Sequence, residues 1–351
     1  MKHNYYLAFL FFLMLTARSQ DTVKVASNLT PEQIAEQDYN SGLAALKKNE
    51  CAVAVELFNK SLVAKPNFDK ALANRAIAYT HLKKHPEALS DINSAIKLNP
   101  QNPEFYFNKS LIFYDLSQRD SQSVALDNCL KINPAHAEGC YYKGIALYET
   151  ADYDKSVDFF TKAITANPNY VYAYNDRASA KRAKADYAGA IADYEKAISL
   201  DASLVFIHNN LGSAYRLNKN YDKAIAAYTK ALQANPNYLV ALNNRGSANF
   251  ENNNLKAAQA DFEEVLKKDP KNSFAYNNLS SIAIKNKDYK KAKDMANRSI
   301  ESDPKNGPAY YNRGIARQML REEADCCNDW KKAYELGVSN AKTFINASCL
   351  D

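Results

Sequence analysis

Seven of the eleven prolines in the chain fall on one arithmetic series with a step of 34 residues. The members of the series are Pro66, Pro100, Pro134, Pro168, Pro236, Pro270 and Pro304, with Ala202 in the one missing place. A fixed period of this length indicates a repeat architecture, in which each unit packs only on its neighbours. We therefore divide the sequence into nine 34-residue units, which start at 35, 69, 103, 137, 171, 205, 239, 273 and 307 and end at 340.

This frame also sorts residues that were not used to set it. The eighth place of the unit holds only Gly, Ala or Ser, and five of the nine glycines fall there. The twentieth and twenty-seventh places are mostly small and the twenty-fourth is mostly bulky, so these three places share one helical stripe. Because glycine costs about 1 kcal/mol inside a helix, the small eighth residue predicts the close passage of another helix backbone. Each unit is predicted to hold two short amphipathic helices.

The thirty-second place explains where each unit ends. Proline there stops the second helix, because its ring lacks an N–H and clashes with the preceding turn. Together with the small eighth and twentieth places and the aromatic twenty-fourth, this pattern makes residues 35–340 resemble tetratricopeptide repeats. A fuller local match is Asn209–Tyr215 followed by Tyr221–Ile225. The resemblance implies an all-α fold, an α-solenoid of antiparallel helix pairs that binds a protein or peptide.

The ends of the array have their own signals. Residues 20–34 form a lead-in, in which Thr30, Pro31 and Gln33 are typical of an N-cap, a first-turn proline and a capping box. Residues 341–351 are expected to form a C-terminal capping helix, which an array needs to cover its last apolar face.

The first nineteen residues differ from the rest. Lys2 precedes the apolar run Leu7–Leu15, and Ala17-Arg18-Ser19 offers small residues for cleavage. The run is too short to span a bilayer, which needs about 20 residues. We therefore expect residues 1–19 to be a signal peptide and the chain to be exported, to a periplasm or outside the cell.

The first helix of each unit should line the concave surface of a solenoid. Asn fills the sixth place in seven of nine units and the fifth place in units five to eight. A side-chain amide both donates and accepts, so a row of them can pair with the backbone of an extended peptide. The candidate binding residues are Asn175, Asn209, Asn210, Asn243, Asn244, Asn277, Asn278, Ser213, Ser247, Tyr141, Tyr148 and Tyr172.

Other interpretations of these residues remain open. The sixth-place Asn can equally brace the neighbouring helix, whereas the fifth and ninth places are expected to face solvent. Each tyrosine can equally pack on an adjacent helix.

Six cysteines in an exported chain can form disulfides. Cys129 and Cys140 lie on elements that should pack together, and Cys326 or Cys327 could reach Cys349 in the capping helix. The alternative is that Cys129 and Cys326, at small-residue places, are buried thiols that behave as small apolar side chains.

The sequence favours binding over catalysis. The net charge of +6 on 351 residues is mild and unclustered, so no nucleic-acid partner is expected. There is no Gly-rich phosphate loop or nucleophile elbow, and no cofactor is expected. His81 and His85 straddle a turn without a third metal ligand. We predict a scaffold that binds an extended peptide or partner protein. A structural subunit of a cell-envelope assembly or secretion complex is the alternative, followed by an enzyme with a site built across repeats.

Overall fold

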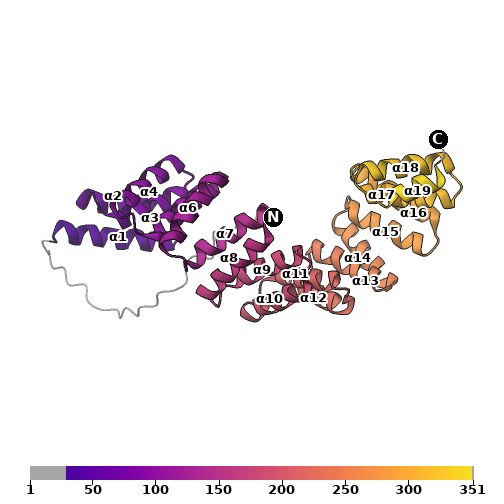
Figure 1. Ribbon diagram of the computed structural model, residues 1–351, viewed down its shortest axis with the longest axis horizontal. Helices are drawn as coiled ribbons and strands as arrows, with labels where there is room; N and C mark the ends of the chain where they lie inside the picture. Colours follow the sequence, from indigo (N-terminus) through magenta and orange to yellow (C-terminus); the bar gives the residue numbers. More distant parts are fainter. Residues whose placement is uncertain (1–28, 350–351) are drawn as a thin grey trace. The chain divides into compact units, whose positions relative to one another are not determined.

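The computed structural model describes residues 29–349, so the expected signal peptide at residues 1–19 lies outside the described part. The described chain divides after Pro168 into two compact bodies, which we treat separately (Figure 1). None of the helices in residues 29–349 has the length and apolar character that crossing a bilayer requires.

The first body is a stack of helix pairs in chain order (Figure 1). Its helices are α1 (Pro31–Lys47), α2 (Cys51–Ala64), α3 (Asp69–His81), α4 (His85–Leu98), α5 (Pro103–Asp115), α6 (Arg119–Ile132), α7 (Ala137–Glu149) and α8 (Tyr153–Ala166).

The second body repeats this arrangement. Its pairs are α9 (Val171–Ala183) with α10 (Tyr187–Leu200), α11 (Val205–Leu217) with α12 (Tyr221–Ala234), α13 (Leu239–Glu251) with α14 (Leu255–Lys268), α15 (Ser273–Lys285) with α16 (Tyr289–Ser302), and α17 (Gly307–Met319) with α18 (Glu323–Glu335). A last helix, α19 (Ala341–Ser348), packs on α18. The predicted all-α solenoid with a C-terminal capping helix is confirmed.

The 34-residue frame coincides with the helices. From the second unit onward, every first helix begins at the first place of its unit. The exception is α1, which begins at Pro31, and there the side chain of Thr30 accepts from the Gln33 N–H while Gln33 caps the Thr30 N–H in return. This reciprocal capping box satisfies two otherwise unpaired backbone donors, so the first helix extends beyond the frame.

The small eighth place lets the two helices of a pair approach closely, as predicted. In the fourth unit the Ser156 hydroxyl donates to the Gly144 carbonyl oxygen at 2.9 Å, so α8 meets the backbone of α7 directly. The space in front of each eighth-place glycine is filled by the ring at the twenty-fourth place of its own unit. The five pairs are Gly42–Phe58, Gly144–Phe160, Gly212–Tyr228, Gly246–Phe262 and Gly314–Trp330. All five rings are fully buried, so the glycine acts as a notch for a core ring.

The turn inside each pair has three residues, and its middle residue is left-handed. All nine of these residues have φ between 58° and 64°, and none is glycine. The set is Asn49, Lys83, Ser117, Ala151, Ala185, Lys219, Asn253, Lys287 and Arg321. This conformation costs an L-residue roughly 1–2 kcal/mol, so each turn holds a small, local strain.

Candidate functional site

Side-chain amides link successive first helices in the second body. Asn210 donates to the Oδ1 of Asn175 at 3.1 Å, and Asn244 donates to the Oδ1 of Asn209 at 2.9 Å. Each bond runs from the sixth place of one unit to the fifth place of the unit before it. We call this row the amide ladder and each such bond a rung.

A third rung joins Asn312 to the Oδ1 of Asn277 at 2.9 Å, and Asn312 also donates to the hydroxyl of Ser281. The sixth-place Asn therefore braces the neighbouring first helix, which was one of the two interpretations open for it.

The fifth place is more buried than the sequence suggested. Asn175 is only 4% exposed and Asn209 only 6%, so the expectation that this place faces solvent is wrong for both. The cause is the rung itself, because the side-chain carbonyl turns toward the next helix to accept a bond. The ninth-place Ser213 and Ser247 are half-buried and donate to the carbonyl oxygens of their own helix four residues earlier.

One rung is missing from the ladder. Asn243 occupies the fifth place and Asn278 the following sixth place, yet the Oδ1 of Asn243 is buried without a hydrogen-bond partner. Next to this break lie two exposed apolar side chains at the second place, Val240 (52% exposed) and Phe274 (67%). A second-place residue lies one helical turn before the fifth and sixth places, so these side chains stand beside the amides.

The second place was only partly recognised from sequence, where Tyr172 was the one member singled out. The same 34-residue frame places Phe206, Val240 and Phe274 in the equivalent position of the next three units. Tyr172 stacks on Phe206 with ring centroids 6.4 Å apart, and both rings are half-buried. The second body thus carries an apolar row along its amide ladder.

The tyrosines predicted to anchor a partner in the first body are largely part of its packing. Tyr141 is 3% exposed and packs on Phe160 and on Tyr142, so it belongs to the core and not to a binding surface. Tyr148 is half-buried against Tyr153, with ring centroids 5.4 Å apart. Tyr141 thus packs on Phe160, the ring that fills the Gly144 notch.

A set of charged pairs, which the sequence analysis missed, fixes first helices to second helices. A seventh-place Arg reaches a twenty-third-place Asp of its own unit at 2.6 Å in four units: Arg75–Asp91, Arg177–Asp193, Arg245–Asp261 and Arg313–Asp329. The Asp side chains are at most 10% exposed and the Arg side chains 15–25%, so each pair is partly buried and its carboxylate is largely shielded from water. Removing one partner of such a pair would leave an uncompensated charge, which makes the pairs structural braces.

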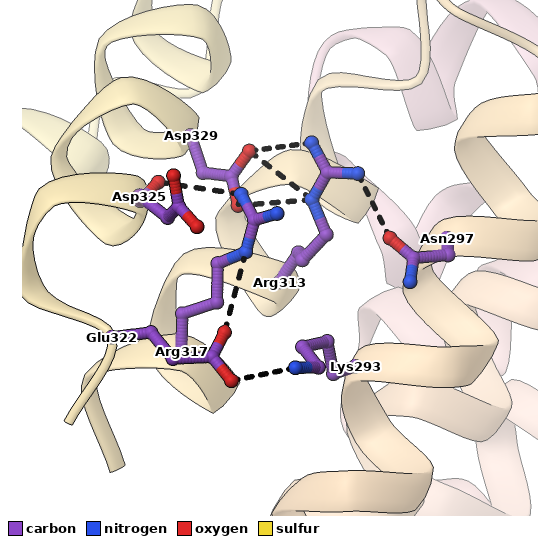
Figure 2. Close-up of polar contacts among 7 residues, drawn as sticks. All are labelled: Lys293, Asn297, Arg313, Arg317, Glu322, Asp325 and Asp329. Carbon is purple, nitrogen blue, oxygen red and sulfur yellow. Dashed lines mark hydrogen bonds and ion pairs between the residues drawn. The ribbon is translucent and has the colours of Figure 1, made fainter. Parts of the chain in front are cut away.

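The ninth unit has the most extended of these networks (Figure 2). Arg313 and Arg317 both bond to Asp329, whose side chain is 3% exposed. Glu322 contacts Arg317 and receives a bond from Lys293 of the preceding unit, so the network spans two helix pairs.

One of the two bridges considered from sequence is confirmed, and Cys129 and Cys326 are buried thiols, which was the alternative for them. Cys327 and Cys349 form the disulfide, and the neighbouring Cys326 is buried without one. Cys129 and Cys140 are free thiols with no measurable exposure, so the bridge considered between them is not formed. Burial raises the pKa of the Cys129 thiol to about 12.

No group of metal ligands is found in residues 29–349. His85 pairs with Asp115 at 2.5 Å, and the same carboxylate receives a bond from Lys83. Of the two histidines considered from sequence, His85 thus lies in a cluster with Lys83 and Asp115.

Four family models described as tetratricopeptide repeats match this chain. The matched segments are residues 69–102, 137–170, 178–218, 205–238 and 249–312. Together these segments cover more than half of the chain.

Solved structures show the same fold. A tetratricopeptide repeat protein from Parabacteroides merdae aligns with a TM-score of 0.61 and 17% identity, over 71% of this chain and 100% of its own. PilF of Pseudomonas aeruginosa aligns with a TM-score of 0.55 and 14% identity over 60% and 96% of the two chains. PilW, a type IV pilus biogenesis factor, aligns with a TM-score of 0.52 and 18% identity over 59% and 95%. A search of curated proteins found no match.

Proposed function

Since the chain belongs to the tetratricopeptide repeat family and is built as an interaction scaffold, we propose that its second body binds an extended polypeptide along the first helices. The observation that carries this proposal is the row of amides beside exposed apolar side chains at Val240 and Phe274. Large apolar groups left in water beside polar partners are typical of interaction surfaces.

The amide ladder supplies the polar half of such a site. A rung uses one N–H of the sixth-place amide and one lone pair of the fifth-place carbonyl, and an Asn side chain has two of each. The half-buried sixth-place amides Asn210 and Asn244 keep one N–H and their oxygen, which can donate to and accept from the backbone of an extended chain. The apolar row then takes alternate side chains.

The test uses fluorescent peptides of about ten Ser, Thr and Asn residues, with leucine at alternate positions or with serine in place of every leucine. We expect the leucine peptide to bind more tightly, and the double variant Val240→Ser, Phe274→Ser to weaken it about tenfold or more. Val124→Ser on α6 is the matched control, because Val124 is 61% exposed and lies in the first body. Equal affinity of wild type and double variant for the leucine peptide would refute the site.

Backbone recognition has its own readout. A leucine peptide with N-methylated backbone amides keeps its side chains but loses its donors. We expect it to bind more weakly than the unmodified peptide, and equal affinity would mean that the amide ladder only braces the helices.

We also propose that the protein works after export. The apolar run Leu7–Leu15 is typical of a signal peptide, and the disulfide between Cys327 and Cys349 supports export because disulfides form in oxidising compartments. A fusion of residues 1–30 to a reporter active only outside the cytoplasm should be active, and one lacking residues 1–19 should not. A stoichiometric complex purified from envelope extracts would instead favour the alternative of a structural subunit.

A further inference from the structure

The capping helix α19 lies where the first helix of a tenth pair would lie. It begins at residue 341, which is 34 residues after the start of α17, so it lies where the next first helix would start. Ala341 is fully buried there, and the ring of Phe344 packs on Trp330 with centroids 5.0 Å apart. The helix covers the last apolar face of the array, which holds Trp330 and Ala333.

Few side-chain contacts hold α19 in place: Phe344 packs on Trp330 and Tyr311, and Gln318 of α17 donates to the Ser348 hydroxyl at 3.1 Å. The helix α19 has eight residues, of which only Ala341 is buried and five are exposed. An isolated helix shorter than about 12 residues is marginal in water. The disulfide ties the residue that follows the helix, Cys349, to Cys327 on α18. The covalent bond therefore fixes the residue after α19 to α18.

The pair beneath the cap is fastened independently of it. Asp329 of α18 bonds to Arg313 and Arg317 of α17, and Glu322 receives a bond from Lys293 of α16 (Figure 2). None of these bonds involves α19. The cap can consequently leave its seat while α17 and α18 stay paired.

We propose that the Cys327–Cys349 disulfide is a redox latch on the capping helix, and that a dithiol reductant releases α19 and uncovers Trp330. In this step two electrons and two protons pass from the dithiol to the bond, which becomes two thiols while the reductant becomes a disulfide. Both sulfur-bearing residues are half-buried, so the bond lies within reach of a reductant. The latch does not depend on the peptide site proposed above, so a negative result in the peptide-binding test leaves it standing.

The chain carries its own reporter for this movement. Trp330 is the single tryptophan and is fully buried beneath Phe344. With dithiothreitol as the probe, we expect the emission of the full-length protein to shift to longer wavelength. Acrylamide should then quench it about twofold or more faster, because local opening admits solvent. Total helix content should fall only slightly, because eight residues unfold at most.

Two variants separate the latch from a general effect of reduction. Cys327→Ser should give the reduced emission without any reductant, whereas Cys51→Ser should behave as wild type, because Cys51 forms no disulfide. Hydrogen exchange of residues 341–348 should rise about tenfold or more in Cys327→Ser, while residues 307–335 keep their protection. Unchanged Trp330 emission and unchanged exchange after full reduction would overturn the latch, as would simultaneous loss of protection in α17 and α18.

Discussion

In both bodies the fifth place of one unit contacts the sixth place of the next, but the side chains that make this contact differ between the two bodies. In the first body Phe107 packs on Tyr142 with ring centroids 5.6 Å apart, and Asn74 donates to the hydroxyl of Tyr39. In the second body the equivalent places are amides that pair with one another, as in Asn209 with Asn244. Packed rings offer few polar groups to a partner, whereas an amide that makes one hydrogen bond still has a donor and an acceptor. The proposed binding row therefore lies in the body whose first helices are linked by amides.

The largest expected effect on stability comes from removing the ring of Phe107, which packs on Tyr142. Phe107 is 1% exposed and packs in one cluster with Leu126 and Cys129. Phe107→Ala should lower the free energy of unfolding of the first body by about 3–5 kcal/mol, because the cavity cannot refill. Urea unfolding followed by hydrogen exchange within residues 103–149 measures it. Phe107→Leu is the control and should cost much less, and a loss below about 1 kcal/mol for the alanine variant would contradict the closed core.

The contact between Phe107 and Tyr142 should also make the free energy of unfolding depend on pH in the alkaline range. Burial, reinforced by Tyr114 and Glu138, raises the pKa of Tyr142 to about 12. The unfolded chain ionises first, near pH 10, so this stability is complete below pH 10 and is lost as the pH rises toward 12. The loss amounts to about 2–3 kcal/mol. Tyr142→Phe should show a shallower decline in unfolding free energy over that range.

Tyr215 in the second body also has its pKa raised to about 12, by burial and by Glu195. The informative quantity is therefore the difference between wild type and Tyr142→Phe at each pH. If the two curves run parallel between pH 10 and 12, the phenol of Tyr142 is not protected by its neighbours.

A smaller effect is expected from removing one hydrogen bond of the amide ladder. Asn243, which holds the same place without such a bond, provides the control. Asn209 is 6% exposed and accepts from Asn244, so Asn209→Leu leaves that donor without its partner and should cost about 1–3 kcal/mol. Asn243 holds the same place one unit later, but its Oδ1 has no partner. Asn243→Leu should therefore be neutral or stabilising. Equal losses in the two variants, measured by urea unfolding, would mean that the rung bonds do not matter.

The period predicts the architecture because every unit obeys one frame. It predicts the close approach of the two helices at the small eighth place, the capping box at Thr30 and the helix that covers the last face, but not the ring that fills the space at each eighth-place glycine. The period does not predict the direction in which an individual side chain points from its helix. Cys326 and Cys327 differ by one place, about 100° around α18, so one faces the core and the other the cap.

The same limit explains the rest of the site. Asn175 and Asn209 were expected to face solvent, but a rung turns them toward the next helix. The Arg–Asp pairs, such as Arg313 with Asp329, join places sixteen residues apart on two helices, and only the crossing of the pair brings them together. Side-chain partners of this kind depend on the packed geometry.

The smallest prediction concerns the left-handed turn, a feature that both bodies share. Ala151 in the first body and Ala185 in the second have φ of 60° and 62° at the middle of their turns. Glycine removes the left-handed cost of about 1–2 kcal/mol but adds roughly 0.5–1 kcal/mol of chain entropy. Ala151→Gly and Ala185→Gly should thus each stabilise the protein by about 0.5–1 kcal/mol, seen as a higher Tm. Ala44→Gly in the exposed face of α1 is the control and should destabilise, because the residue there is helical. Similar gains in both bodies would place their difference in the first-helix contacts and not in the turns, whereas a gain in only one body would show that the turns differ as well.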